Sequence, residues 1–130
     1  MTLHSVLNLM GRAFYSTAVT TDLVNLWDSV DFLFIDEVSM ISCQFLTQIS
    51  HALSVAKGNT ATFGGINVIF AGDFLQLPPP TDARLYDRID GEKCSKTTMG
   101  QDIIFGKLLW LSVQMVVFLT QQHQQTGDNK

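Results

Sequence analysis

Two continuous apolar runs stand out in the pattern of hydrophobic and polar positions. "DFLFID" at 31–36, between its two aspartates, and "INVIFA" at 66–71, apart from Asn67, fill the length of a strand with aromatic and aliphatic side chains. A strand that is apolar at successive positions, rather than at alternate ones, is typical of a parallel sheet covered on both faces. The pattern therefore predicts strands at 32–36 and 66–71 with both faces buried.

A helical pattern separates these two strands. Residues 42–57 begin with Ser42, carry apolar residues at a spacing of three or four, and end with Lys57 and Gly58. A serine before the first turn and a glycine after the last are typical helix boundaries. Weaker patterns predict further helices at 3–10, 21–28 and 102–110.

The helix predicted at 21–28 places Leu23, Leu26 and Trp27 on one face. A third apolar run, "MVVFLT", predicts a last strand at 115–120. Strands that alternate with helices predict an α/β fold in which helices flank a parallel sheet.

The remaining stretches are polar or rich in proline. The proline run in "QLPPP" at 76–80 is incompatible with a helix or an inner strand, because proline lacks the backbone donor. Residues 82–100 are polar and contain glycine and lysine, and they predict an exposed loop. The interleaved acidic and basic residues of this loop favour a solvated segment over a phosphate-binding one.

Composition narrows the class of protein. The chain has 130 residues, of which 46% are hydrophobic and 15% charged, so it is one globular domain or a piece of a larger one. Its net charge of −4 argues against a free-standing basic nucleic-acid binder. Cys43 and Cys94 form no CxxC pair, which favours a reducing compartment over a disulfide framework.

Nothing in the pattern points to a membrane or a secretion signal. Met1 is followed at once by a polar stretch, so no signal peptide is expected. The longest apolar run, at 108–119, contains Gln114 and is too short to cross a bilayer. No membrane partner is expected, and the oligomeric state is left open.

Carboxylates follow the first predicted strand, and a second polar group follows the next. Asp36 and Glu37 end the first strand, and Asp73 and Gln76 come after the second. Ligands in parallel α/β sheets bind beyond the carboxyl ends of the strands. One acid can hold Mg²⁺ while the other polarises a water for attack on a phosphoryl group. On spacing alone, a helix cap near Ser42 or a solvated strand end is an equally good interpretation.

Longer motifs decide between these interpretations. "FLFIDEVSMIS" at 32–42 and "FGGINVIFAGDFLQLPPP" at 63–80 closely resemble motifs II and III of the Pif-one-like DNA helicases. That group belongs to superfamily one, is related to RecD, and includes helicases carried by eukaryotic Helitron transposons. "TLHS" at 2–5 and "LLWLSVQMVVFLT" at 108–120 resemble further segments of the family.

The resemblance covers most of residues 2–125 and implies a fold and a domain division. Residues 1–125 would form part of a helicase motor domain, a partial RecA-like P-loop NTPase domain, and 126–130 a disordered tail. Asp73 is expected to shape the turn after the second strand.

The resemblance also implies roles for individual residues. Asp36 would bind Mg²⁺, and Glu37 would act as the base for ATP hydrolysis. Gln76 would sense the γ-phosphate and couple it to DNA movement. Residues beside the path of single-stranded DNA would be Thr2, His4 and Ser5, although capping of a helix by Ser5 is an equally good interpretation.

Two family features are absent from the 130 residues. The phosphate-binding pattern G-x-x-x-x-G-K-[ST] does not occur, since only Gly106 precedes a lysine and Leu108 follows that lysine. We expect the chain to begin after that loop, so the strand that leads into it would be missing from the sheet. Residues 66–71 would then keep an unpaired edge or pair directly with 115–119. Gln124 stands where the family has an arginine at the γ-phosphate, and it cannot supply that charge.

Isolated histidines and tryptophans receive simpler interpretations. His4, His51 and His123 have no metal-ligand spacing. Trp27 and Trp110 lie in apolar helical patterns, so core packing is favoured over stacking on DNA bases.

The resemblance implies a fragment of an ATP-dependent DNA helicase that uses ATP with Mg²⁺. The parent enzyme would couple ATP hydrolysis to unwinding of single-stranded or duplex DNA substrates in repair, recombination or telomere maintenance. Its expected location is the nucleus, with the mitochondrion or cytoplasm as alternatives. The chain alone is expected to be inactive. A degenerate module that binds DNA or a partner without hydrolysis, and a stand-alone hydrolase using Asp36 and Glu37, are the alternative hypotheses.

Overall fold

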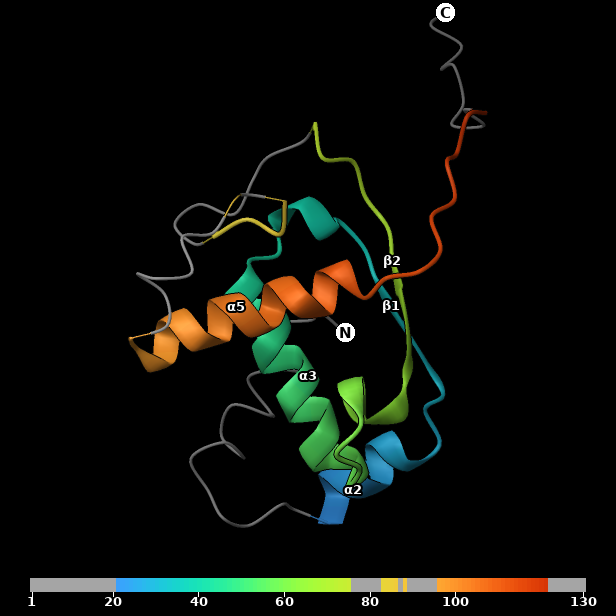
Figure 1. Cartoon of the computed structure of the whole chain (residues 1–130). Coiled ribbons are helices and arrows are strands. Elements are labelled where there is room, and N and C mark those ends of the chain that lie inside the picture. The colour runs from blue at the N-terminus through green and yellow to red at the C-terminus, as the bar shows by residue number, and fades with distance from the viewer. Residues whose placement is uncertain (1–20, 76–82, 87, 89–95, 122–130) are drawn as a thin grey trace, which may run out of the picture.

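The structure is a computed structural model that describes residues 21–75, 83–86, 88 and 96–121. Its elements follow one another along the chain as α2 (Thr21–Asp28), β1 (Phe32–Ile35), η1 (Val38–Met40), α3 (Cys43–Lys57), η2 (Thr62–Gly65), β2 (Asn67–Phe70) and α5 (Thr98–Leu111). Figure 1 shows β1 and β2 side by side, with α3 and α5 crossing each other next to them. The predicted helix at 3–10 and the tail at 126–130 lie outside the described residues.

Helix α3 occupies the span that its sequence predicts. The Ser42 hydroxyl accepts a hydrogen bond from the Phe45 amide at 3.1 Å and caps the first turn. Gly58 ends the helix in the left-handed conformation and donates its amide to the carbonyls of Ser54 and Val55. Each of these residues satisfies backbone groups that a helix end leaves unpaired, so the sequence prediction of 42–57 is confirmed.

The strands β1 and β2 pair in parallel, as predicted. Phe32 lies opposite Asn67, and the register continues to Ile35 opposite Phe70. One face of the pair packs against the helices through its inward-pointing side chains, which are Leu33, Ile35, Val68 and Phe70.

The opposite face of the sheet is exposed, and the prediction that both faces are buried is wrong for the described residues. Phe32 is 66% exposed, Phe34 62% and Ile69 49%. The reason is that α3 and α5 both lie against the other face, and no described element covers this one.

The predicted third strand does not form within the described residues. Residues 113–121 have no regular structure, and the sheet contains two strands. Met115 is 80% exposed and Leu119 92%. A strand is stabilised by backbone hydrogen bonds to a neighbouring strand, and residues 115–120 pair with no strand in the described part of the chain. Among the described residues β2 pairs with β1 alone, so of the two expected outcomes the direct pairing of 66–71 with 115–119 is not found there.

Helix α5 is longer than predicted and begins inside the region expected to be a loop. The Thr97 hydroxyl accepts a hydrogen bond from the Gly100 amide at 2.9 Å, so the helix starts at Thr98 rather than near residue 102. A Cβ at Gly106 would lie 1.8 Å from the Cys43 carbonyl oxygen. Glycine at this position therefore allows α5 to cross closely over the start of α3.

Part of the predicted 82–100 loop is also packed into the core. Leu85 is 1% exposed, and the Cys43 amide donates to the Ala83 carbonyl at 2.9 Å. The buried Cys43 thiol donates to the Arg84 carbonyl at 3.3 Å. The expectation of an exposed loop is thus wrong at Leu85, because a short bridge between Ser42 and Arg84 holds this segment against α3.

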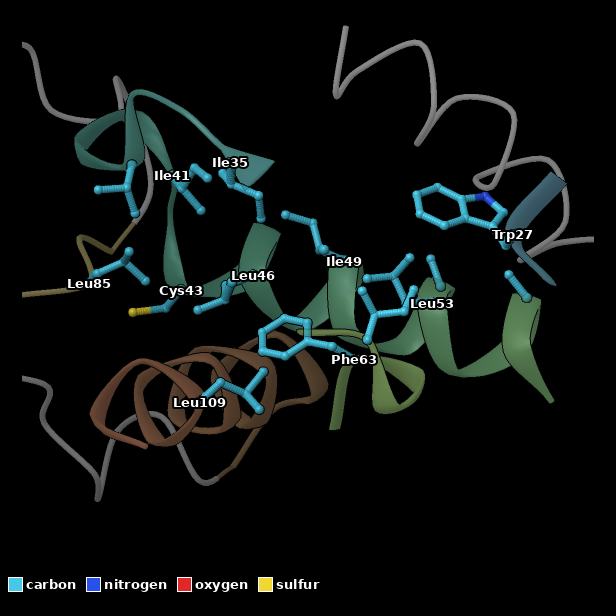
Figure 2. Packing of buried hydrophobic residues seen from close by; sticks show 14 residues of the cluster. Trp27, Ile35, Ile41, Cys43, Leu46, Ile49, Leu53, Phe63, Leu85 and Leu109 are labelled. Atoms are coloured by element: carbon cyan, nitrogen blue, oxygen red, sulfur yellow. The ribbon is translucent and has the colours of Figure 1, made fainter. Parts of the chain in front are cut away.

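The core is centred on α3, whose Leu46, Ile49 and Leu53 are at most 1% exposed. Figure 2 shows these side chains between residues from the other elements, with Trp27 beside the end of α3 that carries Leu53. Trp27 is buried, and Trp110 packs against the cluster, so core packing of both tryptophans is confirmed. Leu26, which the helical pattern places on the same face as Trp27, is 49% exposed, so these two side chains are not buried together. No described helix is long and apolar enough to span a membrane.

Candidate functional site

The candidate site begins where β1 ends. Asp36 and Glu37 follow Ile35 directly, and both carboxylate residues are exposed. One carboxylate oxygen of Asp36 accepts the Glu37 amide at 2.8 Å. This hydrogen bond fixes the orientation of the Asp36 carboxylate relative to the backbone of Glu37 at the carboxyl end of the strand.

Glu37 has a backbone conformation that few residues other than glycine adopt. Its φ of 53° and ψ of 46° lie in the left-handed helical region. Such residues are uncommon and cluster at functional sites, where the surrounding structure holds them in place. The conformation turns the chain from β1 into η1, which buries Val38 and Ser39 while leaving the Glu37 side chain in solvent.

The turn after β1 is bonded to the segment that follows β2. The Ala71 amide donates to the Ile35 carbonyl at 2.8 Å, and the Val38 amide donates to the Ala71 carbonyl at 2.9 Å. The two strand ends are therefore connected by backbone hydrogen bonds beyond the last paired residues. The acids after β1 and the residues after β2 form one edge of the sheet.

Asp73 stands at the same edge and has a structural partner. Its carboxylate accepts the Leu75 amide at 2.9 Å, which forms a tight turn of the chain leaving β2. This agrees with the expectation that Asp73 shapes the turn.

Several predicted site residues lie outside the described part of the chain. These are Gln76, Gln124, Thr2, His4 and Ser5. The prediction that Asp36 and Gln76 lie at one edge of the sheet therefore stays a prediction. The structure brings together the acids of the first strand and the turn that leads toward Gln76.

A chain of aromatic rings lies behind the turn after β2. Phe74 packs edge-on against Tyr86 at 5.1 Å between ring centroids and against Trp110 at 5.6 Å. Trp110 also contacts Phe70 of β2 at 5.5 Å. These rings hold the turn to α5 and to the 83–86 segment. Sequence patterns do not predict this contact, because its members are far apart along the chain and follow no common period.

The donor set at the edge suits one type of metal site. Within the described residues no group of three or more His, Cys, Asp or Glu side chains converges, so a cage made of protein ligands alone is absent from that part. Mg²⁺ is commonly held by one or two carboxylates together with water and substrate phosphates. The exposed Asp36 and Glu37 fit that arrangement.

A separate groove of about 910 Å³ lies between α3, the 58–62 segment and α5. Its walls include Thr47, His51 and Phe105. Neither residues 36–38 at the end of β1 nor residues 71–75 at the end of β2 line it. The groove is therefore distinct from the candidate site.

The chain matches a known family over nearly its whole length. The family model described as PIF1-like helicase matches residues 3–130.

Individual relatives carry the same description. An ATP-dependent DNA helicase PIF1 of Saccharomyces cerevisiae is 30% identical over 105 residues, which are 80% of this chain and 11% of that protein. The ATP-dependent DNA helicase PIF1 of Xenopus laevis is 44% identical over 57 residues, or 44% of this chain and 9% of the relative. The chain thus spans about a tenth of the length of these relatives.

A solved structure, the crystal structure of the Pif1 helicase from Candida albicans, is 30% identical over 62% of this chain. The match covers 20% of that chain with a TM-score of 0.48.

Proposed function

The chain belongs to the PIF1-like helicase family, and from this premise we propose that it forms part of the motor of an ATP-dependent DNA helicase. The α/β fold class and the partial RecA-like domain predicted from the sequence accord with this membership and with the parallel pair β1 and β2. The observation that carries the proposal is the exposed pair Asp36 and Glu37 at the carboxyl end of β1, with its turn bonded to the end of β2. The activity is that of a longer protein in which this segment is one part.

In this proposal the two acids divide the chemistry of ATP hydrolysis. Asp36 is the carboxylate that would hold Mg²⁺, which when bound neutralises charge on the phosphates. The Glu37 carboxylate accepts a proton from the attacking water. The water oxygen then bonds to the γ-phosphorus, and the bond from that phosphorus to the bridging oxygen breaks to release ADP. A carboxylate exposed at the edge, rather than buried in an ion pair, is available for that proton.

Gln76 is proposed to contact the γ-phosphate, because a neutral amide can do so without adding negative charge. It comes directly after Leu75, the last residue of the turn that Asp73 and the Phe74 ring contacts hold in place. Gln124 is proposed to occupy the position of the family's arginine without its charge. Thr2, His4 and Ser5 are proposed to lie beside single-stranded DNA.

The wider role follows from the family. We propose that the parent protein unwinds DNA in repair, recombination or telomere maintenance, with the nucleus as its place of work and the mitochondrion or cytoplasm as alternatives. ATP and single-stranded or duplex DNA are its proposed partners.

The 130 residues by themselves are proposed not to hydrolyse ATP. They contain no G-x-x-x-x-G-K-[ST] pattern, whose amides and lysine hold the phosphates. A charge-assisted hydrogen bond to a phosphate contributes about 1.5 to 3 kcal/mol. Loss of three or four such bonds weakens nucleotide binding by roughly 5 to 10 kcal/mol, which is several decades in affinity.

The test is a fusion protein, called the graft below. A phosphate-binding segment from a PIF1-like helicase is joined before Met1, and the downstream half of the motor is joined after Lys130. ATP turnover stimulated by single-stranded DNA is the measurement. The graft should hydrolyse ATP, and Glu37→Gln should lower kcat by about 10²-fold or more because the proton acceptor is lost.

Asp28→Asn is the matched control, since Asp28 is an exposed carboxylate at the end of α2, away from the strand ends. It should leave turnover unchanged. A folded graft without turnover, or equal rates for the graft and its Glu37→Gln variant, would contradict the proposed function. Turnover by the 130 residues alone would contradict their proposed dependence on the phosphate-binding segment.

A non-catalytic module that binds DNA or a partner is the second candidate, favoured by the uncharged Gln124. An arginine at a transferring phosphate contributes about 10³-fold or more to the rate. The graft with Gln124→Arg should therefore turn over faster than the graft without it. Binding of single-stranded DNA with no turnover in either graft would favour the second candidate.

A further inference from the structure

We infer that Gly72 is a positioning residue for Glu37, and that the absence of a side chain at position 72 sets the place of the proposed catalytic base. The inference rests on the proposed role of Glu37. Gly72 follows β2, and it affects Glu37, which follows β1, through contacts between their backbones.

The space beside Gly72 is filled by the backbone of the acidic turn. A Cβ at position 72 would lie 2.8 Å from the Val38 amide nitrogen and 3.4 Å from the Glu37 carbonyl carbon. It would also lie 3.2 Å from a methyl carbon of Val38. Real Cβ atoms do not approach another atom as closely as 2.8 Å, so one of the two segments has to move.

The atoms that would be displaced belong to a fixed part of the chain. The Val38 amide is the donor to the Ala71 carbonyl, and Val38 is 3% exposed. A side chain that rotates away at little cost is not available to relieve the contact, because the nearest atom is backbone. A Cβ at position 72 would therefore push apart the two segments that this hydrogen bond joins.

Displacement at Val38 passes directly to the acids. The peptide that contains the Val38 nitrogen also contains the Glu37 carbonyl, so it helps to fix the left-handed conformation of Glu37, at φ 53°. The Glu37 amide in turn donates a hydrogen bond to the Asp36 carboxylate. Gly72 itself has φ +155°, a value that side-chain-bearing residues rarely adopt. The contact surface between the two strand ends is thus compatible with glycine and not with alanine.

A second glycine supplies a matched control at the other end of β2. A Cβ at Gly64, which has φ +62°, would lie 2.5 Å from the Leu53 carbonyl oxygen. Gly64→Ala therefore introduces the same atom at another positive-φ position, with a clash against backbone that is at least as close. The clash is with Leu53 of α3, and it does not involve Glu37 or Val38.

The first measurement is amide hydrogen exchange on the 130-residue chain. Gly72→Ala should speed exchange of the Val38 amide by about tenfold or more relative to the Leu46 amide, which donates to the Ser42 carbonyl at 3.0 Å. Gly64→Ala should change the two amides by a common factor, because it destabilises the fold without acting on the turn. An unchanged ratio in Gly72→Ala would overturn the inference.

The second measurement is ATP turnover by the graft, at a temperature where both glycine variants are folded. Gly72→Ala should lower kcat by about tenfold or more with little change in KM, because a misplaced base lowers the rate of the chemical step while the phosphate-binding segment still holds the nucleotide. Gly64→Ala should leave kcat within about twofold. A fall in KM and kcat that is the same in both variants would mean that Gly72 is only structural.

A backbone ester at Val38 covers the case in which Gly72→Ala does not fold. The ester replaces the amide N–H with oxygen, so it removes the bond to the Ala71 carbonyl without adding an atom at position 72. It should lower kcat in the same direction as Gly72→Ala, and an unchanged kcat would overturn the inference. If the graft without substitutions shows no turnover, the proposed function fails, and the Val38 exchange ratio still tests the link between Gly72 and the turn.

Discussion

The two ends of the strand pair contain the same unusual feature in opposite surroundings. Phe63, before β2, and Glu37, after β1, both have φ 53° although neither is glycine. Phe63 is 8% exposed and lies next to Gly64, whereas Glu37 is exposed. Each turn is packed so closely that a glycine, Gly64 or Gly72, has no room for a side chain.

The difference lies in what holds each strained residue. The Phe63 amide donates to the buried Ser50 hydroxyl at 3.1 Å, and its ring contacts Phe70 at 6.2 Å between centroids. Glu37 is held by the Asp36 carboxylate and by the backbone of its neighbour Val38. Burial of the Phe63 side chain offsets the strain in the turn before β2. The exposed Glu37 side chain provides no such compensation in the turn after β1. Strain retained without such compensation is typical of functional positions.

The largest expected effect is on the buried turn. Phe63→Ala should lower the free energy of unfolding by about 3 to 4 kcal/mol, because it removes a buried aromatic side chain and leaves a cavity. Phe34→Ala is the control, since Phe34 is 62% exposed and should change stability by less than about 1 kcal/mol. Chemical denaturation of the 130-residue chain measures both. Equal losses would show that the buried Phe63 turn and the exposed face of the sheet do not differ as described.

The hydrogen bond beneath the buried turn should have the next largest effect. Ser50→Ala leaves the buried Phe63 amide without its acceptor and should lower stability by about 1 to 3 kcal/mol. Ser29→Ala, at an exposed serine, should stay within about 0.5 kcal/mol. A Ser50→Ala variant as stable as the unsubstituted chain would mean that the strained Phe63 turn does not depend on this bond.

The exposed turn should respond in the opposite direction. Glu37→Gly relieves the left-handed strain and loses no buried contact, so it should raise the free energy of unfolding by about 0.5 to 1 kcal/mol. The same substitution in the graft should abolish turnover. Opposite signs for stability and activity would mark Glu37 as a functional residue, and a loss of stability would mark it as a structural one.

The smallest effect is expected at Asp36. Asp36→Asn keeps an oxygen acceptor for the Glu37 amide, so its stability should change by less than about 0.5 kcal/mol. Asp36→Ala removes the acceptor and should cost about 1 kcal/mol. Thermal unfolding of the two variants separates the hydrogen bond from the charge. A large loss in Asp36→Asn would indicate that the charge itself stabilises the fold.

Local patterns predicted the elements that depend on local interactions. Ser42 and Gly58 identify the ends of α3 because their capping bonds involve residues within four positions. Continuous apolar runs identify β1 and β2, and their parallel pairing follows from the helix between them. The start of α5 at Thr98 was missed, since a cap at Thr97 stands in a polar stretch without an apolar period.

The candidate site was predicted in part. The acids at 36 and 37 were found because they interrupt an apolar run at a strand end. The link from Val38 to Ala71, and the contact of Gly72 with that link, join segments separated by more than thirty residues. A periodic sequence pattern does not predict such a contact. The left-handed conformation of Glu37 could not be predicted either, because glutamate disfavours that conformation.

Neighbouring residues were enough to identify the family, strands β1 and β2, helix α3 and the pair of acids, because motifs, caps and apolar runs are local features of the chain. Tertiary structure decided which face of the sheet is covered, whether residues 115–119 pair as a strand, and how the acidic turn is held. These outcomes depend on which segments meet in space. Phe34 and Phe70 read alike in the sequence, and the position of α3 and α5 against one face leaves the first exposed while the second packs against the core.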